Sequence, residues 1–116
     1  MTETLKLTVE DRQGEVAVIY TDGYINNQGG EEIARVAYEL IDNGHKKLLL
    51  NLAKTKIVNS IGISILIEII EKMLEIDGRL AFCSLTPTID KTFNIMGLTQ
   101  YASIYSDEET ALANLG

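Results

Sequence analysis

The sequence predicts an α/β domain built on a mixed sheet of four to five strands, with about four helices. Segments with the apolar patterns of β-strands alternate with segments whose apolar residues recur at every third or fourth position, as on one face of a helix. Glycines follow three of the helical segments, where helices commonly end. A length of 116 residues is typical of one domain, so we expect residues 1–116 to form a single unit.

The predicted strands carry either alternating or continuous apolar residues. They lie at residues 5–9, 16–20, 48–52, 79–84 and 103–105. The turn residues Gln13-Gly14 separate the first two strands and predict a hairpin. The later strands are continuous apolar runs separated by helical segments, which favours parallel pairing through crossover connections.

The predicted helices have recognisable starts and ends. They span Asn27–Asn43, residues 60 to about 77, residues 87–96 and a short segment after Ser106. Thr86 and Pro87 suit the cap and first turn of the third helix, in which Ile89, Phe93 and Met96 share one face. Ser106 and Glu109 have the spacing of a capping box, so we expect Ser106 to cap the last helix.

Charge and composition exclude several functions. A formal charge of −7 and a pI near 4.6 argue against a nucleic-acid partner, which would require clustered Lys and Arg. The N-terminal residues do not form a cationic segment followed by an apolar one, so we expect a cytoplasmic protein without direct membrane insertion.

The lone Cys83 lies in an apolar run and is expected in the core, and the lone His45 is expected on the surface after a helix end. The sequence has no phosphate-binding glycine loop and no cluster of metal ligands, so we expect no cofactor, no metal and no catalytic residues.

The loop expected from Lys56 to Ser64 places Ser60 at the start of the most hydrophobic helix. Unpaired amides and the helix dipole make that position favourable for negative charge. A polar arc of this helix carries Ser64, Glu68, Glu71, Lys72 and Glu75, which we expect to be solvated. The apolar residues Ile63, Ile67 and Leu74 border the same edge, which predicts either packing under a neighbouring element or an exposed patch for a partner.

Several motifs together resemble STAS domains, specifically bacterial anti-sigma factor antagonists. The segment Ile57-Val58-Asn59-Ser60-Ile61-Gly62-Ile63 resembles their Asp-Ser-x-Gly loop, and Gly23-Tyr24-Ile25-Asn26 resembles a turn after the second strand. Gly78-Arg79-Leu80 and the segment from Leu85 to Leu98 resemble later elements in the same order. The resemblance implies a single STAS-like domain with helices largely on one face.

The resemblance also implies a regulatory role without enzymatic activity. Such a domain binds a kinase-type anti-sigma factor and so releases a sigma factor, and phosphorylation of the loop serine ends the binding. Ser60 is then the phosphoacceptor, with a serine phosphatase acting on the phosphorylated form. The implied partner-binding residues are Tyr24, Ile25, Asn26, Asn59, Ile61, Gly62, Ile63, Ser64 and Ile67.

One departure from the family pattern leaves a second interpretation open. Asn59 stands where these domains usually have Asp, and a neutral amide caps a helix but does not make a charge-assisted bond to a kinase. The alternative is a scaffold subunit of a larger regulatory or lipid-transport complex, in which Ser60 is not modified. A hydrolase that uses Ser60 as nucleophile is disfavoured, because the sequence offers no evident base.

Overall fold

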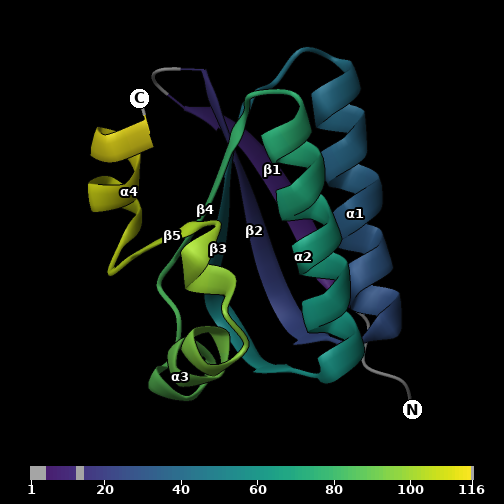
Figure 1. Ribbon diagram of the computed structural model, residues 1–116, viewed down its shortest axis with the longest axis vertical. Helices are drawn as coiled ribbons and strands as arrows, with labels where there is room; N and C mark the ends of the chain where they lie inside the picture. The colour runs from purple at the N-terminus through teal and green to yellow at the C-terminus, as the bar shows by residue number, and fades with distance from the viewer. Residues whose placement is uncertain (1–4, 13–14, 116) are drawn as a thin grey trace.

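Five strands lie side by side in the order in which they occur in the chain, as Figure 1 shows. The computed structural model describes residues 5–12 and 15–115. The strands are β1 (Lys6–Arg12), β2 (Val16–Ile25), β3 (Lys47–Val58), β4 (Arg79–Cys83) and β5 (Ser103–Tyr105). β1 pairs antiparallel with β2, and all later pairs are parallel, which confirms the predicted mixed sheet. The predicted hairpin residues Gln13-Gly14 lie outside the described residues.

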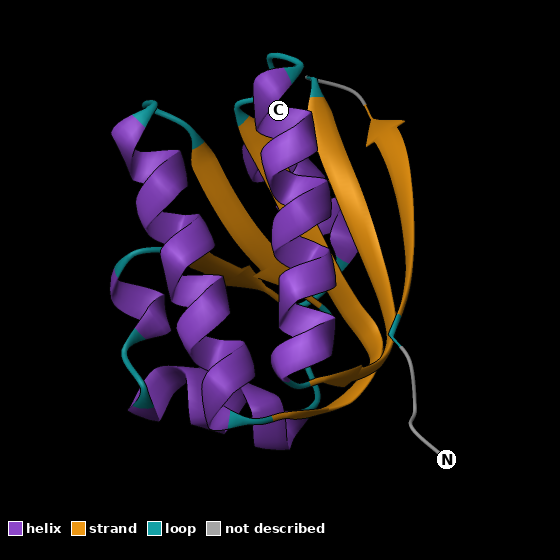
Figure 2. Cartoon of the chain, turned by 90° about the vertical axis from the view of Figure 1, so that its right-hand side faces the viewer, coloured by secondary structure: helices purple, strands orange, loops and turns teal. Residues whose placement is uncertain are grey.

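The helices divide unequally between the two faces of the sheet. They are α1 (Asn27–Asp42), α2 (Ser60–Glu75), α3 (Pro87–Ile95), the 3-10 helix η1 (Leu98–Gln100) and α4 (Glu108–Leu115). Figure 2 shows α1 and α2 running side by side over one face, and buried side chains of α3 join the same core. α4 packs alone on the opposite face, so the helices lie largely on one face as expected.

The sheet separates two apolar cores. The larger core fills the space between the sheet and α1 to α3, and in it the rings of Phe82 and Phe93 meet edge to face with centroids 5.1 Å apart. The smaller core lies under α4 and contains Cys83, whose predicted burial is confirmed. Within residues 5–12 and 15–115, no helix is both long and apolar enough to cross a bilayer.

Three local expectations were wrong. The segment from Lys56 to Ser64 is not a loop, because β3 continues through Val58 by pairing with β2, and α2 begins at Ser60 after the single residue Asn59. Met96 is 48% exposed, since α3 ends at Ile95 and the chain turns away at the left-handed Gly97. Asp107, rather than Ser106, caps α4: its Oδ1 accepts a hydrogen bond of 2.7 Å from the Thr110 amide.

Candidate functional site

Ser60 is the first residue of α2, and it is exposed at the carboxyl edge of the parallel strands. The preceding Asn59 has extended backbone angles, and its Oδ1 accepts a hydrogen bond of 2.8 Å from the amide of Gly62. This bond satisfies one of the amides that a helix start leaves without a partner. The predicted capping role of Asn59 is therefore confirmed, and the Ser60 hydroxyl is carried by a well-defined helix start.

Gly62 allows the start of α2 to lie directly against strand β2. A Cβ atom at this position would lie 2.4 Å from the carbonyl oxygen of Ile25, far closer than any ordinary contact. The same carbonyl accepts a hydrogen bond of 3.1 Å from the amide of Asn59. A side chain larger than hydrogen would push α2 away from the strand. The position of Ser60 thus depends on this close approach.

The turn at the end of β2 lies beside the start of α2, which carries Ser60. In the parallel register Tyr24 is opposite Ile57, and Ile25 is opposite Val58. Asn26 repeats the arrangement of Asn59, because its Oδ1 accepts a hydrogen bond of 2.9 Å from Gly29 and caps α1. α1 and α2 therefore begin next to each other, at the lower end of both helices in Figure 1.

The predicted partner-binding residues separate into exposed and buried groups. Ile61 is 53% exposed and Ser64 is exposed, whereas Tyr24, Asn26, Asn59 and Ile67 are partly buried. The remaining three, Ile25, Gly62 and Ile63, are buried, and their part in partner binding stays a prediction.

These three buried positions hold the fold together. Ile25 on β2 and Ile63 on α2 both belong to the main core. Gly62 has no side chain and lies against Ile25. Of the apolar residues expected to border the edge, Ile63 is packed under the sheet-facing side of α2, while Leu74 is 52% exposed near the other end of the helix.

Sequence reasoning missed Ile57, which is 55% exposed beside the site. A β-branched residue in an apolar segment normally indicates burial, so the sequence offered only the adjacent Lys56 as a sign of exposure. Its place opposite Tyr24 in the strand register puts it at the carboxyl end of β3, three residues before Ser60. We call the surface formed by the following residues the Ser60 edge: Tyr24, Asn26, Ile57, Asn59, Ser60, Ile61, Ser64 and Ile67.

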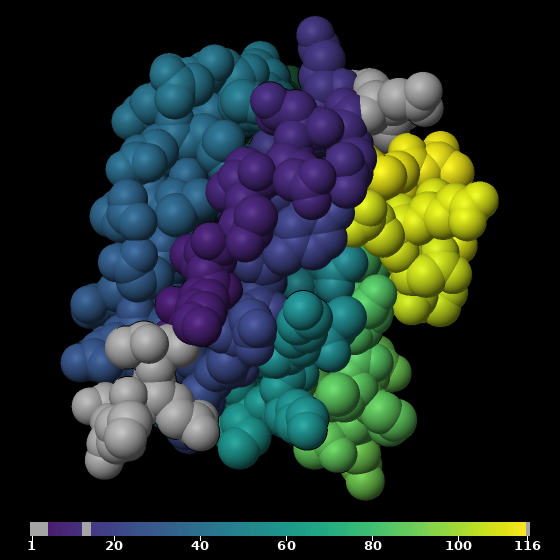
Figure 3. Space-filling view, turned by 180° about the vertical axis from the view of Figure 1, so that it is seen from behind, coloured from purple at the N-terminus to yellow at the C-terminus, as the bar shows by residue number. Residues whose placement is uncertain are grey.

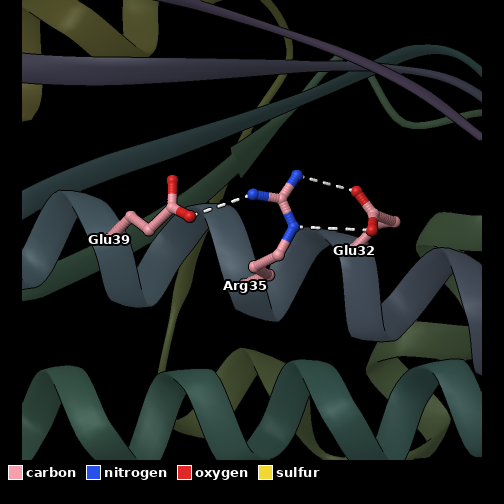
Figure 4. A network of polar contacts seen from close by, with 3 residues as sticks. All are labelled: Glu32, Arg35 and Glu39. Atoms are coloured by element: carbon pink, nitrogen blue, oxygen red, sulfur yellow. Dashed lines mark hydrogen bonds and ion pairs between the residues drawn. The ribbon is translucent and has the colours of Figure 1, made fainter.

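The outer surface of α1 and α2 is acidic. The two helices carry seven carboxylates and two cations, a net −5 of the formal −7 of the chain. Figure 4 shows one of the cations, Arg35, between Glu32 and Glu39 at 2.9 Å from each. The hydrogen bond and charge of Arg35 lower the pKa of Glu32. The predicted polar arc of α2 is confirmed, since Glu68, Glu71 and the other members are exposed.

Chemistry-bearing side chains elsewhere lie away from Ser60. His45 follows the opposite end of α1, a helix about 24 Å long, and its ring contacts Asp11 and the Leu40 carbonyl at 3.1 Å each. Burial raises the pKa of Cys83 to about 11, which keeps its thiol protonated. Among residues 5–12 and 15–115, no three His, Cys, Asp or Glu side chains lie close enough together to hold a metal ion.

Comparisons with known proteins agree with this architecture. A family model described as STAS domain matches residues 8–111. A Bordetella bronchiseptica protein named "Putative anti-sigma factor antagonist BtrV" is 22% identical over 109 residues, which cover 94% of this chain and 93% of that protein.

Solved structures with this fold include a "putative anti-sigma factor antagonist" from Thermotoga maritima. It has a TM-score of 0.86 at 15% identity and covers 94% of this chain and 93% of its own. The phosphorylated form of the Bacillus cell fate determinant SpoIIAA has a TM-score of 0.75 at 20% identity, covering 96% of this chain and 100% of its own. At these identities the structural likeness concerns the fold.

Proposed function

The chain belongs to the STAS domain family, and we propose that it is an anti-sigma factor antagonist whose Ser60 edge binds a kinase-type anti-sigma factor. Binding of the antagonist releases the sigma factor, and phosphorylation of Ser60 ends the binding. The observation that carries the proposal is the exposed Ser60 hydroxyl at a capped helix start, with exposed Ile57 and Ile61 nearby. The protein acts in this proposal as a regulatory binding domain rather than as an enzyme.

A phosphate on Ser60 is compatible with the fold but prevents binding of the partner. The Ser60 oxygen takes the terminal phosphoryl group of ATP, ADP leaves, and the hydroxyl proton passes to a base of the kinase. The product carries about −1.5 to −2 charges, which the amides and dipole of a helix start favour. An apolar partner surface seated on Ile57 and Ile61 would instead have to bury this charge, at a large desolvation cost.

The proposed partners follow from the two states of Ser60. A serine-kinase anti-sigma factor binds and phosphorylates the unmodified form, and a serine phosphatase restores the hydroxyl by hydrolysing the phosphoester. The acidic surface of α1 and α2 beside the edge favours a kinase with basic residues around its apolar contact surface. We place this exchange in the cytoplasm, where ATP and sigma factors occur.

Asn59 supports one alternative from a different class. It keeps the helix cap but lacks the carboxylate of the family pattern, and the 53% exposed Ile61 adds bulk next to Ser60. In the alternative, the chain is a scaffold subunit of a larger regulatory or lipid-transport complex, and Ser60 stays unmodified. A stable complex with a permease or ATPase subunit, together with an unmodified Ser60 in cells, would favour this function.

The direct test uses a purified serine-kinase anti-sigma factor from the same organism. We expect phosphosite mapping after incubation with ATP to find phosphate on Ser60. Ser60→Ala should bind the kinase as the unmodified protein does, whereas Ser60→Asp should bind more weakly. Ser106→Asp, which adds the same charge at an exposed serine before α4, is the matched control and should bind normally. Equal binding of both Ser60 variants, or no modification by a kinase active on another antagonist, would overturn the proposal.

A further inference from the structure

Helix α4 covers an apolar surface that is separate from the main core. Figure 1 shows α4 on the opposite side of the sheet from α1 and α2. Beneath it lie apolar side chains from three strands, namely Val16, Val18, Leu49, Ala81 and Cys83. α4 itself contributes the buried Ala111 and Leu115, with Leu112 partly buried. Because the sheet divides the two cores, removing α4 need not disturb the packing of α1 to α3.

A single carboxylate ties the start of α4 to the sheet. One oxygen of Glu108 accepts a hydrogen bond of 3.1 Å from the side-chain amide of Asn51 on β3. The other oxygen lies 3.5 Å from the guanidinium of Arg12 on β1. Arg12 in turn donates a hydrogen bond of 2.9 Å to the hydroxyl of Tyr20 on β2. Glu108 is 24% exposed, so these bonds are only partly screened by water. Glu108 thus joins α4 directly to β3 and β1, and Arg12 extends this network to β2.

The sheet surface next to α4 contains a hollow that α4 does not cover. A hollow of about 410 Å³ lies on the same face and is lined by residues of β1 to β3, including Tyr20 and Asn51. Figure 3 shows this face, with α4 in yellow beside β1 in purple. Both of these lining residues belong to the contacts that hold α4, because Asn51 donates to Glu108 and Tyr20 accepts from Arg12, the partner of Glu108. Movement of α4 would therefore extend the hollow onto the apolar strands.

We propose that α4 is a releasable cover, held closed by Glu108, whose opening exposes the apolar face of β2 to β4 while the main core stays folded. The small number of buried side chains on α4 makes this opening cost less free energy than global unfolding, because proteins open locally where few apolar contacts are buried. Opening of α4 involves neither Ser60 nor a partner bound at the Ser60 edge.

Cys83 provides a built-in probe for the opening. It is the only cysteine of the chain, is fully buried under α4, and belongs to the smaller core. A buried, protonated thiol does not react with an aromatic disulfide such as dithiobis(nitrobenzoate), whereas an exposed thiol at pH 8 does. The rate of labelling of the native protein therefore measures how often α4 opens.

The experiment compares labelling rates with global stability for two variants. Glu108→Ala removes both bonds to the sheet and should speed Cys83 labelling about tenfold. Ile69→Val shortens a buried side chain of the main core, so it should lower the urea midpoint of unfolding. Because it destabilises the closed and open forms equally, its labelling rate should match that of the unmodified protein.

Two results would overturn the proposal. If Ile69→Val speeds labelling by the factor that its loss of stability predicts, Cys83 reacts only through global unfolding, and α4 does not open separately. If Glu108→Ala leaves the labelling rate unchanged, Glu108 does not hold the cover. Glu108→Gln keeps an acceptor for Asn51 and loses the charge facing Arg12, so it should give a smaller acceleration of about twofold to fivefold. Urea unfolding followed by circular dichroism establishes that each variant is folded.

Discussion

The close contact between Gly62 and strand β2 makes a strong prediction about Gly62→Ala. The added Cβ would lie 2.4 Å from the Ile25 oxygen, so α2 must move by about 1 Å to restore an ordinary contact of 3.4 Å. Overpacking of this kind costs about 1–3 kcal/mol. The displacement also weakens the cap from Asn59 to the Gly62 amide, while alanine regains up to about 1 kcal/mol of helix propensity. The net expected loss is about 2 kcal/mol.

Urea unfolding monitored by circular dichroism measures this loss. With a slope of about 2 kcal/mol/M, the midpoint of Gly62→Ala should fall by about 1 M. Gly29→Ala repeats the perturbation on α1, because a Cβ there would lie 2.5 Å from the Tyr24 oxygen, and it should cost a similar amount. Ile61→Ala, at an exposed position in the same turn of α2, is the control and should stay within about 0.5 kcal/mol of the unmodified protein. A Gly62→Ala protein that is as stable as the original, as helix propensity alone would predict, would refute the reasoning.

Three further predictions concern the caps and one buried polar pair. Asn59→Ala should lower the free energy of unfolding by about 1 kcal/mol through loss of the cap, whereas Asn59→Asp should match the original at pH 7; equal urea midpoints for all three proteins would contradict this. Thr55→Val should cost about 1–2 kcal/mol, because it removes the 2.5 Å hydrogen bond between the Thr55 and Thr21 hydroxyls and leaves the buried Thr21 hydroxyl only its 3.4 Å bond to the Asn51 carbonyl. The double variant Thr21→Val/Thr55→Val should cost less than the sum of its single variants, and strict additivity would show that the pair is not coupled. The amide of Thr110 lowers the pKa of Asp107, so this carboxylate stabilises the fold above its ordinary value of 3.8 and loses that contribution as pH falls through the lowered value. Asp107→Asn should therefore be less stable than the original at pH 7, and the difference should shrink as pH falls below 3.8; urea midpoints over this range would measure it, and a constant difference would contradict the assignment.

The order and type of the elements could be predicted because the apolar patterns and helix-end residues act locally. The alternation of strands and helices was correct, as was the cap at Asn59. The length of β3 could not be predicted, since Lys54 and Lys56 interrupt its apolar run and only pairing with β2 keeps the segment extended. Local patterns do not report such pairing between distant segments.

The position of the candidate site could be predicted from the sequence, but which of its residues are buried and which are exposed could not. Ser60 follows from the helix start, which is a local feature. The burial of Ile25 and the need for glycine at Gly62 go with one contact between residues 37 positions apart. Ile57 is exposed although the next residue, Val58, packs against the main core. These features depend on tertiary arrangement, so a pattern of residue types along the chain does not contain them.

The central claim is that phosphate on Ser60 removes the partner without disturbing the fold. The most direct measurement is calorimetric titration of the kinase-type anti-sigma factor with the unmodified protein and with protein carrying phosphate on Ser60, alongside their melting temperatures. The claim predicts binding weakened by at least about 100-fold, equivalent to about 2.7 kcal/mol, with nearly equal melting temperatures. Equal affinity of the two forms, or weaker binding that accompanies a large fall in melting temperature, would contradict it.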